Sequence, residues 1–161
     1  MDTKSLLLKY WELAATTEGW YPPYAEALRD IDVTLANWRP EGQRVNTIWE
    51  TVAHVTYFKE RLLARIQGKP DKPLSSNDDT FVVTGSGAAE WQAAVARLLA
   101  AHDVLLLVLS DMRVEDLDQL QPKEPLVKQF MDLIAHDAYH SGQIMLLRKL
   151  YGAWPERRSY L

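Results

Sequence analysis

Apolar residues recur along most of this chain at intervals of three and four positions, the spacing that places side chains on one face of an α-helix. The alternation of apolar and polar residues that is typical of β-strands is hard to find. The helical pattern covers residues 3–16, a shorter piece at 24–31, residues 47–67, residues 88–109 and residues 126–151. Four long amphipathic segments joined by long connections predict an all-α fold, a four-helix bundle. With 161 residues the chain has the length of one domain, and we expect a single bundle over residues 1–161.

The ends of these segments carry capping and turn residues. The second long segment begins near Asn46 or Thr47; Asn46 is the expected N-cap, and Glu50 lies close to the position of the capping-box carboxylate. The fourth is expected to stop before Gly152. Residues 68–86 form a polar connection longer than most loops of compact domains. This connection is therefore a candidate lid or crossover.

The composition excludes some classes of function. The chain has 18 Lys and Arg against 22 Asp and Glu, a formal net charge of −4, whereas a nucleic-acid-binding face needs clustered basic residues. The local basic pair Arg157 and Arg158 is expected to be solvated. The chain has no cysteine, which excludes disulfides, thiolate metal ligands and a cysteine nucleophile. We therefore expect no nucleic-acid partner.

Two apolar stretches require a choice between a membrane segment and a buried helix. The apolar stretch near the start of the chain is interrupted by Lys9, Glu12 and Glu18 and is too short to span a bilayer. The run VLLLVL at 104–109 lacks a polar face, and we expect it to be buried on several sides, in the core or against a partner. The sequence thus predicts a soluble, cytoplasmic protein with no membrane partner.

The segment LIAHDAYHSGQI (133–144) contains the most informative pattern, two histidines four positions apart on an apolar helix face. Such a pair can bind one metal ion, because residues one turn apart lie on the same side of a helix. His54 lies on the apolar face of the second long segment and is the expected third ligand, with His136 and His140. Three imidazoles leave open positions, as catalytic metal sites do. The alternative is that all three are packing residues of the core or of an interface.

His102 and Asp137 are expected to lie outside the metal site. His102 is next to Asp103 near the edge of its apolar stripe, which favours a structural role. Asp137 follows the first histidine of the pair, where the zincin motif has its catalytic Glu, so the pattern does not predict a protease. We interpret Asp137 as a solvated carboxylate beside the site; the alternative is that it orients a ligand imidazole.

Three further residues are candidates for the pocket. Gln143, one turn after His140, either hydrogen-bonds a metal-bound water or substrate or lies on the helix surface. Tyr57, close to one turn after His54, either lines the pocket or only packs. Arg148 is the candidate for binding an anionic cosubstrate, since guanidinium groups pair well with carboxylates, although a surface salt bridge is the commoner role.

Two segments resemble the signatures of the DinB-like family of four-helix bundle proteins. They are NTIWETVAHVTYFKERLL (46–63) and HDAYHSGQIMLLRK (136–149), and lesser agreement is seen at LANWRP, DDTF and AAEWQ. The resemblance implies a bundle with up-down-down-up-like connectivity and a metal site at His54, His136 and His140. It further implies a homodimer and a divalent ion, foremost zinc or nickel, otherwise manganese or iron. Characterised members include transferases and isomerases that use low-molecular-weight thiols such as bacillithiol, mycothiol or glutathione.

These observations leave two functional hypotheses. The first is a divalent-metal-dependent enzyme that transfers a low-molecular-weight thiol to a small electrophilic substrate or hydrolyses it; only the resemblance favours thiol transfer. The second is a non-catalytic metal-binding or stress-response bundle, since the sequence offers no clear general acid or base beyond the histidines. A DNA-binding protein ranks third because of the acidic charge balance.

Overall fold

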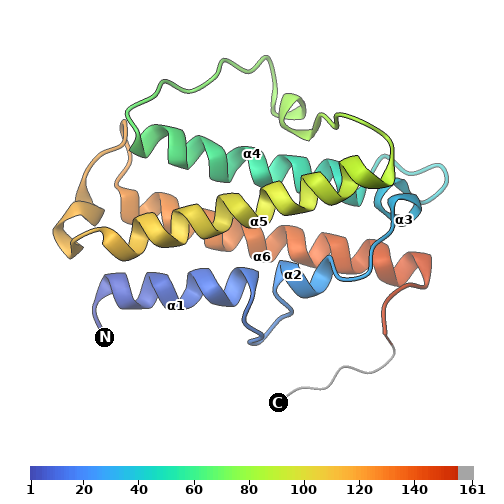
Figure 1. Cartoon of the computed structure of the whole chain (residues 1–161), viewed down its shortest axis with the longest axis horizontal. Coiled ribbons are helices and arrows are strands. Elements are labelled where there is room, and N and C mark those ends of the chain that lie inside the picture. Colours follow the sequence, from blue (N-terminus) through green and yellow to red (C-terminus); the bar gives the residue numbers. More distant parts are fainter. Residues whose placement is uncertain (156–161) are drawn as a thin grey trace.

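Four long helices lie along one another in the computed structural model, which describes residues 1–155 (Figure 1). They are α1 (Thr3–Ala15), α4 (Ile48–Ile66), α5 (Ala88–Asp111) and α6 (Leu126–Tyr151). Two short helices, α2 (Tyr24–Ala27) and α3 (Val33–Asn37), and two 3₁₀ turns, η1 (Asn77–Phe81) and η2 (Val114–Asp118), lie in the connections. Within the described residues there is no strand, only an isolated bridge between Leu120 and Pro125. The prediction of an all-α bundle is confirmed; Arg157 and Arg158 lie outside the described residues.

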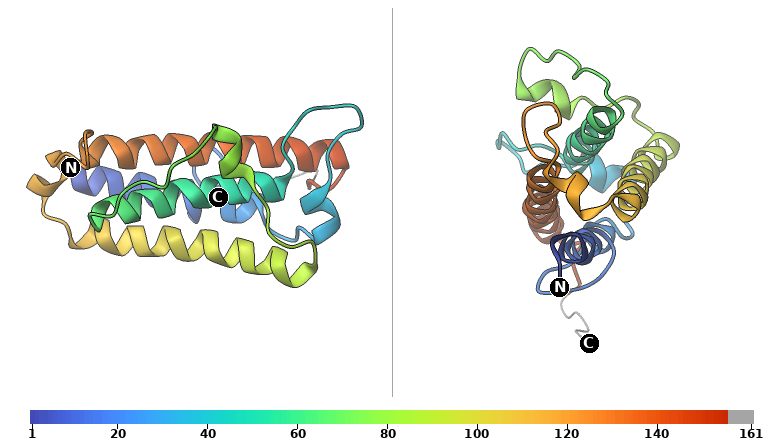
Figure 2. Two further views of the ribbon diagram at one scale, coloured as in Figure 1. Left: turned by 90° about the horizontal axis from the view of Figure 1, so that it is seen from above. Right: turned by 90° about the vertical axis from the view of Figure 1, so that its left-hand side faces the viewer.

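The direction of the helices follows the expected up-down-down-up order. In Figure 1, α4 and α5 run parallel to each other, while α1 and α6 run the opposite way. The connection at residues 67–87 therefore returns along the outside of α4 before α5 begins, and it carries η1 (Figures 1 and 2). The predicted long connection is a crossover, and it brings a further segment of chain alongside α4.

Capping residues explain where the two helices next to the site begin and end. Thr47 caps α4: its hydroxyl accepts a hydrogen bond from the backbone N–H of Glu50 at 3.1 Å, and the Glu50 carboxylate accepts one from the Thr47 N–H at 2.6 Å. This reciprocal pair is a capping box, so Thr47 rather than Asn46 is the cap. The last helix, α6, ends at Gly152, whose φ of 84° lies in the left-handed region that glycine adopts readily.

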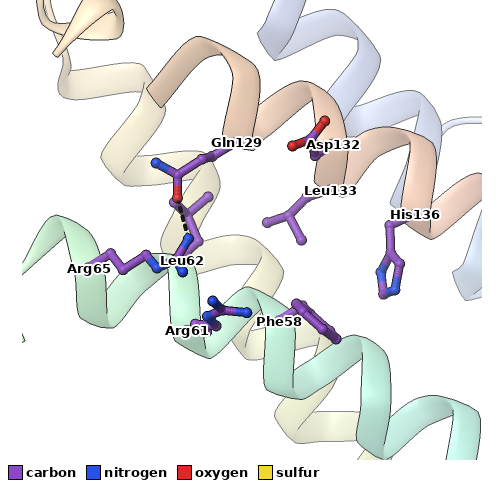
Figure 3. Close-up of a pocket in the computed structure, with 8 residues that line it drawn as sticks. All are labelled: Phe58, Arg61, Leu62, Arg65, Gln129, Asp132, Leu133 and His136. Carbon is purple, nitrogen blue, oxygen red and sulfur yellow. Dashed lines mark hydrogen bonds between the residues drawn. The ribbon is translucent and has the colours of Figure 1, made fainter. Parts of the chain in front are cut away.

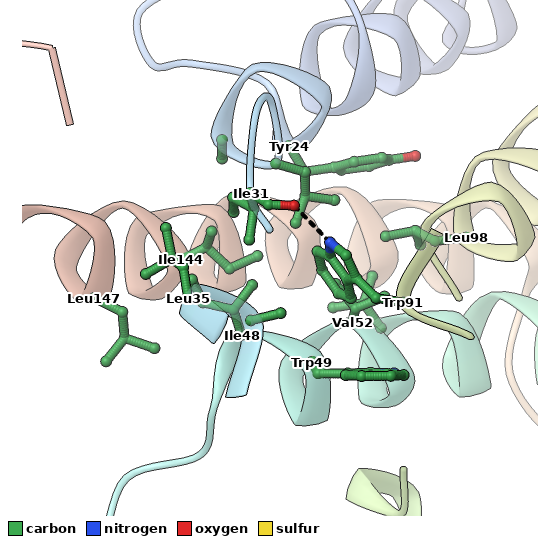
Figure 4. Close-up of a cluster of buried hydrophobic side chains, with 14 of the residues drawn as sticks. Tyr24, Ile31, Leu35, Ile48, Trp49, Val52, Trp91, Leu98, Ile144 and Leu147 are labelled. Atoms are coloured by element: carbon green, nitrogen blue, oxygen red, sulfur yellow. Dashed lines mark hydrogen bonds between the residues drawn. The ribbon is translucent and has the colours of Figure 1, made fainter. Parts of the chain in front are cut away.

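Two apolar clusters fill the bundle at different heights. One joins α2, α3, the start of α4 and α5 and the end of α6; in it the Trp91 indole donates to the Ile31 carbonyl at 2.7 Å (Figure 4). The other, around Trp11 and Phe130, joins α1, the end of α4 and α5 and the start of α6. Polar side chains are buried between the two clusters: His54, Lys59, His102, Asp137, His140 and Ser141. The bundle therefore has a polar layer at mid-height.

The apolar run of α5 is less buried than the sequence suggested. Leu105 and Leu109 are buried, but Val104 is 41% exposed and Leu107 is 65% exposed, because the run turns one face outward. By length and composition α5 is the one described helix that could cross a membrane, and 28% of its apolar window is buried. It packs along α4 and α1.

Candidate metal centre

The three predicted ligand histidines meet in the polar layer. His54 projects from α4, and His136 and His140 project from adjacent turns of α6, which packs against α4. The Nε2 atom of His136 lies 2.9 Å from Nε2 of His54 and 3.0 Å from Nε2 of His140. The possible ligand atoms of the three residues all lie within 4.8 Å of one another. The structure therefore brings together the group that the sequence predicted.

Hydrogen bonds at the far side of two rings determine which nitrogen carries the proton. The Thr80 hydroxyl donates its proton to the Asn77 carbonyl at 2.6 Å, so it accepts from Nδ1 of His54, also at 2.6 Å. The Gln143 carbonyl oxygen can only accept, and it lies 2.7 Å from Nδ1 of His140. Both rings therefore carry their proton on Nδ1 and direct the Nε2 lone pair at the centre of the group.

His136 cannot satisfy both of these lone pairs. A neutral imidazole has one proton. If His136 carries its proton on Nε2, it can donate to His54 or to His140 but not to both. If it carries the proton on Nδ1, it donates to neither, and Nδ1 is buried without a partner among the described residues. Metal-bound nitrogens at 2.0–2.1 Å from a tetrahedral ion are about 3.3 Å apart, close to the Nε2 spacings found here. The surplus of lone pairs and their spacing fit a divalent cation bound by three imidazoles.

Aromatic rings pack against two of the three histidines. Phe81 stacks on His54 with ring centroids 3.9 Å apart, and Phe58 makes edge contacts with His54 at 4.9 Å and with His136 at 5.1 Å. Thr80 and Phe81 both belong to η1, so the crossover supplies a hydrogen bond and a wall to the site. In the sequence, the segment DDTF is marked only by the resemblance, and nothing in it predicts the roles of Thr80 and Phe81.

Burial keeps the three imidazoles neutral. It lowers the pKa of His54 to about 4, with a smaller contribution from His140. It lowers the pKa of His136 to about 3, helped by His140, His54 and Lys59. Burial also lowers the pKa of His140, against the hydrogen bond to Gln143. At neutral pH the nitrogens are free to bind a cation, because only neutral imidazole is a metal ligand.

A pocket of about 260 Å³ opens beside His136, between α4 and α6 (Figure 3). Its lining consists of Phe58, Arg61, Leu62, Arg65, Gln129, Asp132, Leu133 and His136. One ligand histidine therefore borders a space large enough for a small molecule. Such a space is a feature of catalytic metal sites, where part of the ion's surroundings stays accessible.

Asp137 is not the solvated carboxylate that we expected. It is fully buried and lies 2.5 Å from the ammonium group of Lys59, which is also fully buried. The Lys59 nitrogen lies 4.4 Å from the centre of the Trp11 ring. Asp137 follows His136 by one residue, so its side chain leaves α6 about 100° around the helix from the ligand, toward α1 and α2. Neither residue of the pair lines the pocket at His136.

His102 also lies in this buried layer and is separate from the metal group. Its ring stacks on Trp11 with centroids 4.9 Å apart, and neither ring nitrogen has a hydrogen-bond partner among the described residues. Burial, helped by the charge of Lys59, lowers its pKa to about 3. His102 is thus a neutral packing residue in this structure, in keeping with the structural role predicted for it.

The structure brings only one of the three pocket candidates to the site. Gln143 holds His140 in place. Tyr57 contacts Phe58 at 5.3 Å but lines two outer pockets instead of the one at His136. Arg148 is buried near the end of α6, where it donates to the carbonyls of Ala27 at 2.9 Å and Ala153 at 3.0 Å. Arg148 thus ties α6 to α2, apart from the histidines.

Unfolding of the metal-free protein is expected to take up protons at mildly acidic pH. The folded pKa values of His54, His136 and His102 lie near 4, 3 and 3, below the ordinary value of 6.5. Between these values the unfolded chain binds more protons, so stability is full above pH 6.5 and falls as the pH drops toward 4. Urea unfolding with chelator at pH 7, 6 and 5 measures this, with a slope of about three protons near pH 5. Equal stability at pH 7 and 5 would contradict neutral burial.

The comparison with protein families gives the same family as the resemblance of residues 46–63 and 136–149. The family model described as the DinB superfamily matches residues 22–144. The match includes His54, His136 and His140 and begins after α1. Comparisons with curated proteins and with solved structures gave no match. Since the family match spans most of the chain and the helical architecture agrees with it, the protein belongs to the DinB superfamily.

Proposed function

We propose that this protein is a divalent-metal-dependent enzyme whose ion is held by His54, His136 and His140. The observation that carries the proposal is the convergence of three Nε2 atoms, two of them with their lone pairs fixed inward by Thr80 and Gln143. Imidazole donors suit zinc and nickel, which we propose foremost, and also iron; manganese is included on the strength of the family. The reaction is the attack of a small nucleophile, a low-molecular-weight thiol or water, on an electrophilic substrate.

The residues of the site have separable roles in this reaction. A divalent ion supplies Lewis acidity, which lowers the pKa of a thiol or a water molecule. Thr80 and Gln143 hold two ligand rings in place, as hydrogen-bond partners of metal ligands do. Phe58 and Phe81 keep bulk water away from the rings, which strengthens electrostatic interactions there. The pocket beside His136 receives the substrate.

The alternative is a non-catalytic metal-binding or stress-response bundle. The pocket that borders His136 favours the enzyme, because a storage or structural site needs no adjacent space for a small molecule. Within the enzyme hypothesis, thiol transfer is preferred over hydrolysis on the strength of the family. A cytoplasmic location and a role without nucleic acid remain part of the proposal.

A homodimer also remains part of the proposal, supported by one surface. Exposed apolar side chains follow the outer face of α6, namely Met131, Tyr139, Leu146 and Leu150. Large apolar residues in a line on one helix are a common feature of subunit interfaces. A second copy of the chain on this face would bury them.

The proposed activity is expected to require one metal and to disappear with chelator. Untagged protein is stripped and reloaded with Zn²⁺, Ni²⁺, Mn²⁺ or Fe²⁺. Loss of free thiol is followed with glutathione, cysteine or 2-mercaptoethanol and the electrophile 1-chloro-2,4-dinitrobenzene; ester hydrolysis is followed in parallel. We expect turnover with one of these ions and none with the stripped protein. Stoichiometric metal without turnover of any of these substrates would favour the non-catalytic alternative.

A further inference from the structure

We propose that Arg61 is the substrate-binding residue of the pocket beside His136, and that the substrate held there, the thiol or the electrophile of the proposed reaction, carries a carboxylate. The inference rests on the proposed function, which places the reacting end of the bound substrate at the histidine group. It assigns the other end of the molecule to the guanidinium of Arg61, on α4, with apolar contacts to Phe58 and Leu133 between them (Figure 3).

Two arginines line this pocket, Arg61 and Arg65, but only Arg61 has a guanidinium nitrogen without a partner among the described residues. Each of the three guanidinium nitrogens of Arg65 has a partner: Nε and Nη2 donate to the Asp71 carboxylate at 2.8 and 2.5 Å, and Nη1 donates to Gln129 at 2.9 Å. Arg61 donates to Asp71 through Nε at 2.9 Å and lies 2.8 Å from it through Nη2. Its Nη1 contacts no partner among the described residues. The free edge of Arg61 is therefore available to a ligand.

Asp71 fixes the position of Arg61, but its single negative charge is shared between Arg61 and Arg65. The hydrogen bonds from Arg65, followed by those from Arg61, keep the pKa of Asp71 well below its usual range, so the carboxylate is charged at all physiological pH values. One carboxylate between two guanidinium groups leaves one positive charge uncompensated at this end of the pocket. A side chain fixed in this way loses little freedom when a ligand binds, which favours affinity.

The shape and lining of the pocket favour a carboxylate on a short apolar stem. The guanidinium plane suits a carboxylate, which accepts two parallel N–H groups. The space between Arg61 and His136 is bordered by Phe58, Leu62 and Leu133, which offer no hydrogen bonds to a polar stem. The volume of about 260 Å³ limits the ligand to a small molecule. The negative charge of Asp132 at the rim disfavours a more highly charged anion.

Thiols with and without a carboxylate test the inference on metal-loaded protein. Co²⁺-substituted protein is titrated with HS-(CH₂)n-COO⁻ acids and with the mercaptoalcohols of equal length, and the thiolate-to-cobalt absorption band gives each Kd. We expect the best acid to bind about tenfold more tightly than its alcohol, the effect of one charge-assisted hydrogen bond. Arg61→Gln should remove this preference and leave the alcohol's Kd unchanged. Arg97→Gln, which removes an exposed arginine paired with Glu60, should keep the preference.

The outcomes separate this inference from the proposed function. Full cobalt uptake with equal affinity for acid and alcohol, or a preference that survives Arg61→Gln, overturns the inference and leaves the metal site intact. Absence of cobalt uptake overturns the proposed function. In that case hexanoate and 1-hexanol are titrated into the metal-free protein by NMR: shifts at the pocket that favour hexanoate and vanish in Arg61→Gln support the inference, and any other result overturns it.

Discussion

Lys59→Met is expected to lower the free energy of unfolding by about 3–5 kcal/mol, the usual cost of removing one partner of a buried ion pair. The ammonium of Lys59 lies 2.5 Å from the Asp137 carboxylate, and both side chains are fully buried. Burial raises the pKa of Asp137 and lowers that of Lys59, and their mutual attraction opposes both effects. Without Lys59 the carboxylate must stay charged without a partner or take up a proton. Urea unfolding at pH 7 measures the loss.

Two controls identify the cause of this loss. The double variant Lys59→Met/Asp137→Val should recover most of the stability, because a well-packed apolar pair of similar volume is about as stable as a buried ion pair. Lys128→Met removes a half-exposed lysine that pairs with Glu124 and Asp132, and it should cost less than about 1 kcal/mol. If Lys59→Met cost no more than Lys128→Met, the buried pair would not be a charged pair in solution.

His136→Ala is expected to reduce metal affinity by more than about 100-fold, since loss of a ligand costs more than the 10–100-fold loss from removal of a ligand's hydrogen-bond partner. Its Nε2 lies within 3.0 Å of the Nε2 atoms of both other ligands, so its removal breaks the group at its centre. Elemental analysis of untagged protein gives the stoichiometry, and competition with a chelating dye gives the affinity.

Three further variants show whether the loss of metal affinity in His136→Ala is specific to the histidine group. Thr80→Val and Gln143→Leu remove the hydrogen bonds that orient His54 and His140, and each should weaken metal binding by about 10–100-fold. His102→Phe keeps the stacking contact with Trp11 and should retain the metal, because His102 lies outside the group. Stoichiometric metal in His136→Ala, or its loss in His102→Phe, would show that the ion is held elsewhere.

The sequence was sufficient to predict the helices and the three histidines of the candidate site because both follow from periodicity along single segments. Spacings of three and four predicted four long helices, and the same rule placed His136 and His140 on one face. His54 required only that its apolar face turn inward. These are local rules, and the bundle leaves few alternatives for how amphipathic helices pack.

Contacts between distant segments were not predictable in the same way. Asp137 reads as a surface residue because its partner, Lys59, lies 78 positions away on another helix. Thr80 and Phe81 lie in a connection without periodicity, so nothing in their spacing indicates that they reach His54. Arg148 is a candidate from the sequence for binding an anionic cosubstrate because guanidinium groups bind anions. It instead contacts backbone carbonyls, and a sequence does not indicate which carbonyls are free to accept. Each of these contacts depends on the three-dimensional path of a connection.

The crossover between α4 and α5 is attached to the site at two points, and this has a consequence for how the family can vary. Asp71 is bound to Arg61 and Arg65 at one end of the pocket, and Thr80 is bound to His54 at the metal group. Surface loops generally accept insertions and exchange between relatives. Here a change of length between the two attachment points alters both the contact of Asp71 with the two arginines and the contact of Thr80 with His54. Substrate range and metal preference in such bundles are therefore expected to evolve together, through one segment of chain.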